Sequence, residues 1–394
     1  MTRSTRRGFL LSPALPLGAR AALAAQGARP GTGRLKITDV RTVRLRTIKE
    51  QGSLEPAWAP GSRMAFRQGG DVLVEIVTDQ GLTGIGPAGF FSNPAVAKAS
   101  LAGQDPFDLD LRATGGPGVD IALWDLIGKA CGQPLAKLFR AAKDKVPAYA
   151  SMVQLSNADE RAQLARRLAA EGWRGFKLRL HFDTMKEDIR AVEAVRAAVG
   201  DRMTIMVDAN QAQSAGNWQP GPLWDFRRAL DTARELERLN CFWLEEPLPR
   251  YHFDQIAELN RQVAIPIAGG ENNRGIHEYL AMLQQGVYDI LQPEVANSGI
   301  SDLRKIGVLA DAFGRSVVPH HGGSALGIVA HLHLIASWPH APWIELLHDP
   351  PVCDYRDHFA IFTEPPALDK EGYLAVPRKP GLGVEIRPDL ILKG

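Results

Sequence analysis

Short apolar runs alternate with amphipathic segments along the chain after Val146. The segments between the runs space their apolar residues three or four positions apart, as a helix requires. Strands that alternate with helices predict a parallel α/β sheet, and this many units favour a barrel over an open sheet. The predicted strands are 148–150, 175–180, 204–210, 242–246, 266–270, 290–294, 316–320 and 343–346.

The region before residue 146 has a different pattern. Residues 35–46 and 71–78 alternate apolar and polar side chains, which predicts strands, and residues 119–139 predict a helix interrupted near Gly132. Residues 51–70 are rich in Gly, Pro and Ser and predict a loop. We therefore expect a small α+β domain over 35–145, a barrel over 146–346 and a C-terminal segment, 347–394, that returns to the small domain.

The first residues resemble an export signal. Residues 4–10 read Ser-Thr-Arg-Arg-Gly-Phe-Leu, as in a twin-arginine signal, and Ala22-Leu23-Ala24 offers a small-residue cleavage site. A disordered basic tail is the alternative interpretation. We expect a removable leader over residues 1–25 and a periplasmic or exported protein.

Charge and cysteine content exclude several classes of protein. The formal charge of the 394 residues is +2, and four arginines of the expected leader supply more than this excess. The remaining chain has no long basic run, which argues against nucleic acid or an anionic membrane surface as a partner. The three cysteines are widely separated, so they predict buried structural thiols rather than a zinc site or a disulfide framework.

Three carboxylates, Asp208, Glu245 and Glu271, each stand at the end of an apolar run. A buried carboxylate is costly unless a cation receives it. Because the carboxyl ends of parallel strands meet at one mouth of a barrel, these oxygens should converge there. They predict a site for a hard divalent ion, for which we expect Mg²⁺.

Alternation along the strands brings further polar side chains to the same mouth. Lys177 and Arg179 share one face of their strand, and Asn210 points inward with the carboxylate two positions earlier. The pattern turns Glu246 the other way, which suggests a supporting or structural role. The other inward carboxylates are Glu294 and Glu345.

Together these residues resemble the enolase superfamily, in its mandelate racemase and acid-sugar dehydratase branch. The likeness includes the sequence Gly-Val-Asp-Ile-Ala-Leu-Trp-Asp-Leu-Ile-Gly-Lys-Ala at residues 118–130 and Pro-Gly-Leu-Gly-Val-Glu at 380–385. It implies a modified (β/α)7β TIM-type barrel with an N-terminal α+β capping domain. Because relatives commonly form symmetric assemblies, it also implies a homo-oligomer. The segment between residues 106 and 118 is shorter than the family usually shows.

The resemblance also implies the roles of individual residues. The metal ligands would be Asp208, Glu245 and Glu271, and Glu345, if protonated, would donate a hydrogen bond to the substrate. Lys177 would add positive charge beside an enediolate, the dianion formed when a proton is removed next to a carboxylate.

The general acid and base is expected to be His321, oriented by Glu294, although the neighbouring His320 is a competing candidate. Strand alternation after Val317 and the family's spacing both favour His321. His320 is otherwise expected to contact substrate, as are Asn210 and His181.

Two residues depart from the family's pattern. Arg179 replaces the second lysine of a pair and is a poor proton acceptor, which weighs against a racemase with two bases. Glu294 replaces an aspartate. We expect Mg²⁺-dependent dehydration of a sugar acid. A racemase, epimerase or cycloisomerase that uses the same enediolate remains an alternative, as does a non-catalytic periplasmic sugar-acid binding protein.

Overall fold

The structure, a computed structural model, describes residues 34–89, 92–109, 115–213 and 221–393. The expected leader therefore lies outside the described residues, as does part of the shortened 106–118 segment. Residues 35–394 form one compact unit. Within the described ranges, no helix is both long and apolar enough to cross a membrane.

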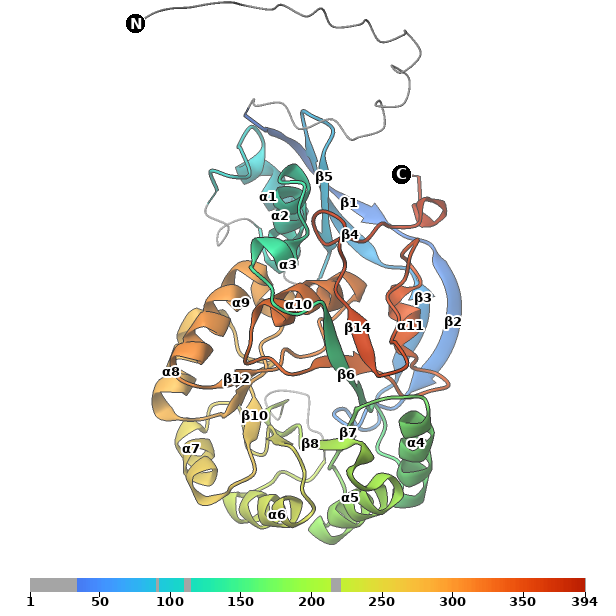
Figure 1. The fold of residues 1–394 in the computed structure, drawn as a ribbon, viewed down its shortest axis with the longest axis vertical. Coiled ribbons are helices and arrows are strands. Elements are labelled where there is room, and N and C mark those ends of the chain that lie inside the picture. Colours follow the sequence, from blue (N-terminus) through green and yellow to red (C-terminus); the bar gives the residue numbers. More distant parts are fainter. Residues whose placement is uncertain (1–33, 90–91, 110–114, 214–220, 394) are drawn as a thin grey trace, which may run out of the picture. The chain divides into compact units, whose positions relative to one another are not determined.

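A curled, mainly parallel sheet forms the larger part of the fold, and its helices follow one another around the outside of the strands (Figure 1). The parallel strands lie in the order β12-β11-β10-β9-β8-β7-β6-β13. Their bounds are β6 Lys145–Ser151, β7 Gly175–Arg179, β8 Thr204–Asp208, β9 Leu244–Glu245, β10 Ile267–Gly269, β11 Ile290–Leu291, β12 Ser316–Val317 and β13 Ile344–Leu347. The predicted barrel of α/β units is confirmed, but several strands end earlier than their apolar runs.

The helices of the barrel are α4 Ala158–Ala170, α5 Met185–Val199, α6 Phe226–Arg238, α7 Phe253–Gln262, α8 Gly275–Gln285, α9 Val295–Ala312 and α10 Ala325–Ser337. Their apolar faces pack on the outside of the sheet. Inside it, side chains such as Tyr149, Met206 and Trp243 form a separate buried cluster that fills the centre. The barrel is thus a packed scaffold, and its chemistry is confined to the strand ends.

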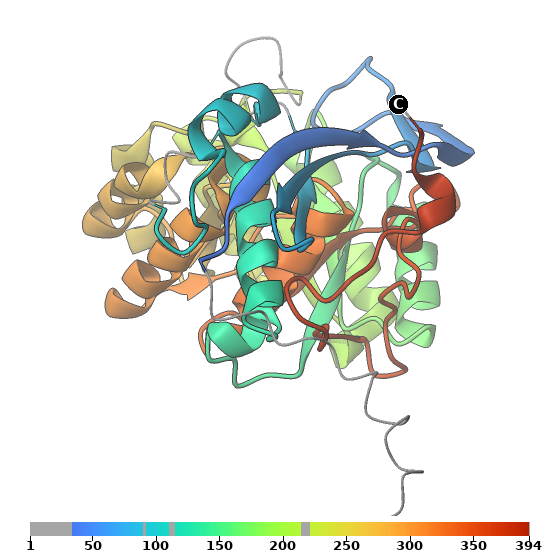
Figure 2. The same ribbon diagram turned by 90° about the horizontal axis from the view of Figure 1, so that it is seen from above.

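The N-terminal cap combines two antiparallel sheets with three helices. Strands β1 Ile37–Arg44, β4 Val72–Thr78 and β5 Thr83–Pro87 pair in the order β1-β4-β5. Helix α2 Pro117–Ala130 packs against β4 and β5 (Figure 2). The other helices are α1 Pro94–Leu101 and α3 Leu135–Leu138, so the helix predicted to break near Gly132 does so.

The region predicted as a loop, residues 51–70, is instead largely a β-hairpin. Strands β2 Thr47–Leu54 and β3 Met64–Gly69 pair antiparallel, with register shifts that accommodate Gly52. Its connecting loop reaches the barrel, because the Ala57 N–H donates to the Val153 carbonyl at 2.8 Å. Backbone pairing between these two consecutive strands outweighed the local preference of Gly and Ser for turns.

The C-terminal segment runs back along both parts of the molecule. Strand β14, Tyr373–Ala375, pairs antiparallel with β6, and Ile391 bridges to Leu45 beside the cap sheet. The short helix α11, Tyr355–Phe359, packs against β3. The expectation of three buried thiols is wrong for Cys131, which is exposed at the end of α2, whereas Cys241 and Cys353 are buried.

Candidate active site

Three carboxylates converge where neighbouring strands end. Asp208 and Glu245 are the last residues of β8 and β9 and lie side by side in the parallel register. Glu271 follows β10, after Gly270 has turned the chain. All three side chains are buried, and each offers an oxygen within 4.8 Å of the others. The structure thus brings together the acidic triad that the sequence predicts.

The triad carries more negative charge than a buried site tolerates by itself. Burial raises the pKa of Glu245 to about 8, and the nearby Asp208 carboxylate adds to this effect. Three hard oxygen donors that repel one another form the ligand set that a divalent cation such as Mg²⁺ or Mn²⁺ accepts. The residues present therefore fit a metal ion.

Lys177 supplies a fixed positive charge next to the triad. Its ammonium group is fully buried and lies 2.8 Å from Glu245, 3.0 Å from Glu345 and 3.6 Å from Asp208. Burial alone would lower its pKa, but these carboxylates outweigh that effect and raise it. Lys177 is therefore held as a cation.

Glu345, at the second position of β13, is held as an anion. Burial would raise its pKa, but the cations Lys177, His320 and Arg179 outweigh that effect and keep it below its usual range. The hydrogen bond expected from a protonated Glu345 to the substrate stays a prediction.

The guanidinium group of Arg179, at the end of β7, forms hydrogen bonds with several neighbouring protein groups. The group is buried, and the carboxylates around it raise its pKa although burial opposes them. A side chain held so firmly as a cation cannot accept a proton. Its partners are Asp208, Asn210 Oδ1 at 3.1 Å, Ser151 Oγ at 3.2 Å, the Met152 carbonyl at 2.9 Å and, at 4.8 Å, the ring of Trp58 from the β2–β3 loop.

Asn210 and His181 form a second layer around Asp208. Asn210 has a left-handed backbone, with φ of 45°, and its N–H donates to Asp208 Oδ1 at 2.8 Å. Its side-chain amide donates to Asp208 Oδ2 at 3.1 Å. Since the Asn210 Oδ1 atom is an acceptor, His181 Nε2 donates to it at 3.0 Å. Both residues thus support a triad ligand, while the predicted contacts with substrate remain predictions.

The hydrogen-bonded histidine and glutamate pair is Glu294–His320, rather than the expected Glu294–His321. Glu294 Oε2 accepts from His320 Nδ1 and from the Gly322 N–H, both at 2.9 Å. Its other oxygen accepts from the Ala296 N–H at 2.9 Å at the start of α9. The alternation rule failed because β12 ends at Val317, and the chain beyond it is no longer a strand.

His320 also faces the triad, with its Nε2 3.3 Å from Glu271 Oε2. Burial would lower the pKa of His320, but the carboxylates of Glu271, Glu345 and Glu294 outweigh it and raise the pKa to about 10. His320 therefore links the glutamate that orients it with the edge of the proposed metal site.

His321 has a different environment. Its ring packs against His358 of α11, with 5.0 Å between the ring centroids, and among the described residues its buried Nε2 has no hydrogen-bond partner. Burial and the two neighbouring histidines lower its pKa to about 3. The structure thus separates the two adjacent imidazoles, and His320 is the one placed beside the triad.

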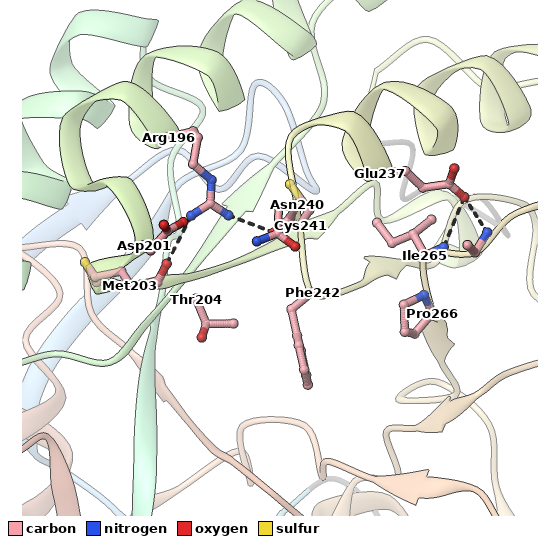
Figure 3. A pocket seen from close by; sticks show the side chains of 11 residues that line it. Arg196, Asp201, Met203, Thr204, Glu237, Asn240, Cys241, Phe242, Ile265 and Pro266 are labelled. Carbon is pink, nitrogen blue, oxygen red and sulfur yellow. Dashed lines mark hydrogen bonds between the residues drawn. The ribbon is translucent and has the colours of Figure 1, made fainter.

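A second hollow, of about 530 Å³, lies at the opposite ends of the same strands (Figure 3). Arg196 lines one side of it and donates to the carbonyls of Leu239 at 3.0 Å and Asn240 at 2.8 Å. Glu237 accepts from the backbone N–H groups of Ala264 and Ile265. Arg196 and Glu237 thus form hydrogen bonds with backbone groups, so their role at this hollow is to stabilise the fold.

The fold and the mouth together define a class: a barrel enzyme with a capping domain and an acidic metal site. Comparison with known proteins agrees. Residues 159–390 match the family model described as "Enolase C-terminal domain-like". The chain belongs to the enolase superfamily, in its acid-sugar dehydratase branch, whose members bind a divalent metal.

Several relatives have named activities. The chain is 34% identical to arabinonate dehydratase of Saccharolobus solfataricus over 68% of its own length and 69% of the relative's. It is 32% identical to L-talarate/galactarate dehydratase of Salmonella typhimurium, covering 70% and 72%. It is 31% identical to D-galactarolactone cycloisomerase of Agrobacterium fabrum, covering 91% and 98%.

Solved structures support the same assignment. A member of the enolase superfamily from Polaromonas sp. JS666 superposes with a TM-score of 0.73 at 25% identity, covering 90% of this chain and 96% of that one. The 3,6-anhydro-D-galactonate cycloisomerase from Zobellia galactanivorans has the same fold, with a TM-score of 0.70 at 23% identity and coverage of 91% and 100%.

Proposed function

We propose that the chain is a Mg²⁺-dependent dehydratase of a sugar acid, with His320 as its general base and then its general acid. The observation that carries this proposal is the placement of His320 between Glu294 and Glu271, at one edge of the triad.

A divalent ion on the triad would offset the negative charge that raises the pKa of His320, and neutral His320 would then accept the proton from the carbon next to the substrate carboxylate. Glu294 holds the opposite ring nitrogen and stabilises the imidazolium that forms. The electrons of the broken C–H bond move into the carboxylate and create the enediolate. His320 then returns the proton to the β-hydroxyl, which leaves as water, and the resulting enol becomes a keto acid.

The positive charges at the mouth have separate tasks. When bound, a divalent ion on Asp208, Glu245 and Glu271 supplies positive charge to the substrate carboxylate and to the enediolate. Lys177 adds a fixed positive charge next to Asp208 and Glu245. Arg179 forms an ion pair with Asp208 and remains protonated, so Arg179 does not serve as a second base.

A one-base arrangement favours dehydration over two-base racemisation. In syn elimination the same group can remove the α-proton and protonate the leaving hydroxyl, whereas a racemase needs a base on each face of the α-carbon. Since Arg179 stands where the second base of the family's lysine pair would be, the chain retains one clear acid–base group.

A cycloisomerase is the second candidate, and a specific observation favours it. The relative that matches nearly its whole length to this chain is named D-galactarolactone cycloisomerase. In its lactone substrate the bond from the β-carbon to the ring oxygen would break, so the leaving group would be a carboxylate that stays in the product rather than a hydroxyl that leaves as water. One base is sufficient for that reaction also.

A substrate screen distinguishes these functions. We would incubate the protein and Mg²⁺ with stereoisomeric pentonic, hexonic and aldaric acids and with D-galactarolactone, in D₂O, and follow products by NMR. Release of water with formation of a keto-deoxy acid supports the dehydratase. Ring opening of the lactone alone would favour the cycloisomerase, and inversion without loss of water would contradict both. Tight binding without exchange or product across the whole set would indicate the binding-protein alternative.

A further inference from the structure

Glu246 is a fourth buried carboxylate at the barrel mouth, and strand alternation does not predict its position. The strand β9 ends at Glu245, and Glu246 has φ of 45°, in the left-handed region that residues other than Gly rarely adopt. Its backbone is fixed on both sides, since its N–H donates to the Ala268 carbonyl and its carbonyl accepts from the Gln211 N–H, both at 2.9 Å. A strained conformation of this kind is often retained for function.

The side chain of Glu246 reaches the triad through one amide group. The Asn272 Nδ2 atom lies 3.3 Å from Glu246 Oε1 and also 3.3 Å from Glu271 Oε1. Asn272 therefore donates to both carboxylates and ties the orientation of one to the other. The Glu271 carbonyl is held separately, because Asn297 donates to it at 2.9 Å.

The second oxygen of Glu246 is also informative. Glu246 is fully buried, and within the part of the chain that the structure describes its Oε2 atom has no hydrogen-bond partner. Leaving a buried polar atom unsatisfied is destabilising. The contact of Glu246 with the triad therefore runs through its Oε1 atom and Asn272.

We propose that Glu246 is a positioning residue of the metal centre: through Asn272 it fixes the carboxylate of Glu271 in the orientation that completes the triad. The groups that orient a metal's ligands typically contribute 10–100-fold to metal affinity. This inference rests on the proposed metal function, and it predicts a loss of affinity that is separate from catalysis.

The test is a titration with Mn²⁺, followed by electron paramagnetic resonance and calorimetry in the absence of substrate. Glu246→Ala removes the acceptor, and Glu246→Gln keeps the shape but not the charge. We expect Mn²⁺ affinity to fall roughly 10–100-fold in Glu246→Ala. The Mn²⁺ affinity of Glu246→Gln should lie between those of Glu246→Ala and the wild type, since the amide oxygen of the new side chain can still accept from Asn272.

Glu278→Gln is the matched control. Glu278 accepts from Asn273 at 2.6 Å in the same turn, so it forms a similar carboxylate–amide pair without contact to the triad. The Mn²⁺ affinity of the Glu278→Gln variant should stay within about twofold of that of the wild type. Circular dichroism of each metal-free variant checks that the fold is kept.

A double-mutant cycle tests whether Glu246 acts through Asn272. If it does, Asn272→Ala should weaken binding on its own, and adding Glu246→Ala should cause little further loss. Unchanged Mn²⁺ affinity in folded Glu246→Ala, or fully additive losses in the double variant, would overturn the role of Glu246. A wild-type protein that binds no Mn²⁺ would instead contradict the proposed metal centre itself.

Discussion

The two ends of strands β8, β9 and β10 use charged residues in opposite ways. At the amino ends, Arg196 and Glu237 are each paired with backbone groups, and the hollow between them is stabilised by those bonds. At the carboxyl ends, Asp208, Glu245 and Glu271 face one another. Both ends contain buried or half-buried charges, but at the carboxyl ends three carboxylates lie close enough that one oxygen of each is within 4.8 Å of the others.

This difference shows how a structural charge can be distinguished from a functional one. A charge that stabilises a fold is matched by its own donors or acceptors, so its neighbourhood is neutral. A site that must bind an ion keeps like charges together, although this costs stability in the ion-free protein. The size of a cavity does not reveal the difference, since the hollow at the amino ends is of the size of a ligand pocket.

The largest expected effect is at the carboxyl end, in Asp208→Asn. Loss of one ligand should lower kcat/KM on the order of 10³-fold, because the charge that stabilises the enediolate depends on it. Differential scanning calorimetry gives an independent check. Mg²⁺ should raise the melting temperature of the wild type by mass action but not that of the variant. Equal stabilisation of both proteins would show that the ion binds elsewhere.

Two lysines, the buried Lys177 and the half-buried Lys143, test the comparison next. Lys177→Met should lower kcat about 10²–10³-fold, since it removes a fixed charge beside the reacting carboxylate. Lys143, which precedes β6, donates to three backbone carbonyls, those of Ile335, Trp338 and Ala341. Lys143→Met should lower the melting temperature and leave kcat unchanged. A fall in kcat of similar size in both variants would mean that general destabilisation explains the Lys177 result.

The smallest effect is expected at the amino end, in Glu237→Ala. Two backbone N–H groups lose their acceptor, so urea unfolding should show a loss of about 1–3 kcal/mol in the free energy of unfolding. Steady-state kinetics should be unchanged. Glu235→Ala, which removes only an exposed ion pair with Arg238, should cost less than about 1 kcal/mol. A clear loss of activity in Glu237→Ala would contradict the assignment of a structural role to the amino ends of these strands.

Most of the fold and the triad could be predicted because both depend on regular features. Apolar runs at a constant spacing identify the strands of the barrel, and a carboxylate directly after such a run must lie at the mouth. Lys177 and Arg179 follow from alternation within a continuous strand. These predictions need only local geometry and the closure of the sheet.

The predictions that failed lie where the backbone leaves regular geometry. Alternation selected His321, but β12 ends at Val317, and irregular chain carries His320 to Glu294. Glu246 was expected to point away in a supporting or structural role, and a left-handed φ brings it to Asn272, which alternation alone does not predict. The sequence gives little sign of either change, although Pro319 beside His320 suggests that the strand stops early.

The central claim is that His320, and not its neighbour, is the acid–base group beside the metal triad. The most direct measurement is the rate at which deuterium enters the α-carbon of a sugar acid that binds but is not dehydrated, in D₂O with Mg²⁺, compared between His320→Asn and His321→Asn. We predict a loss on the order of 10²–10⁴-fold for His320→Asn and less than about 10-fold for His321→Asn. Exchange that persists in His320→Asn and disappears in His321→Asn would contradict the account.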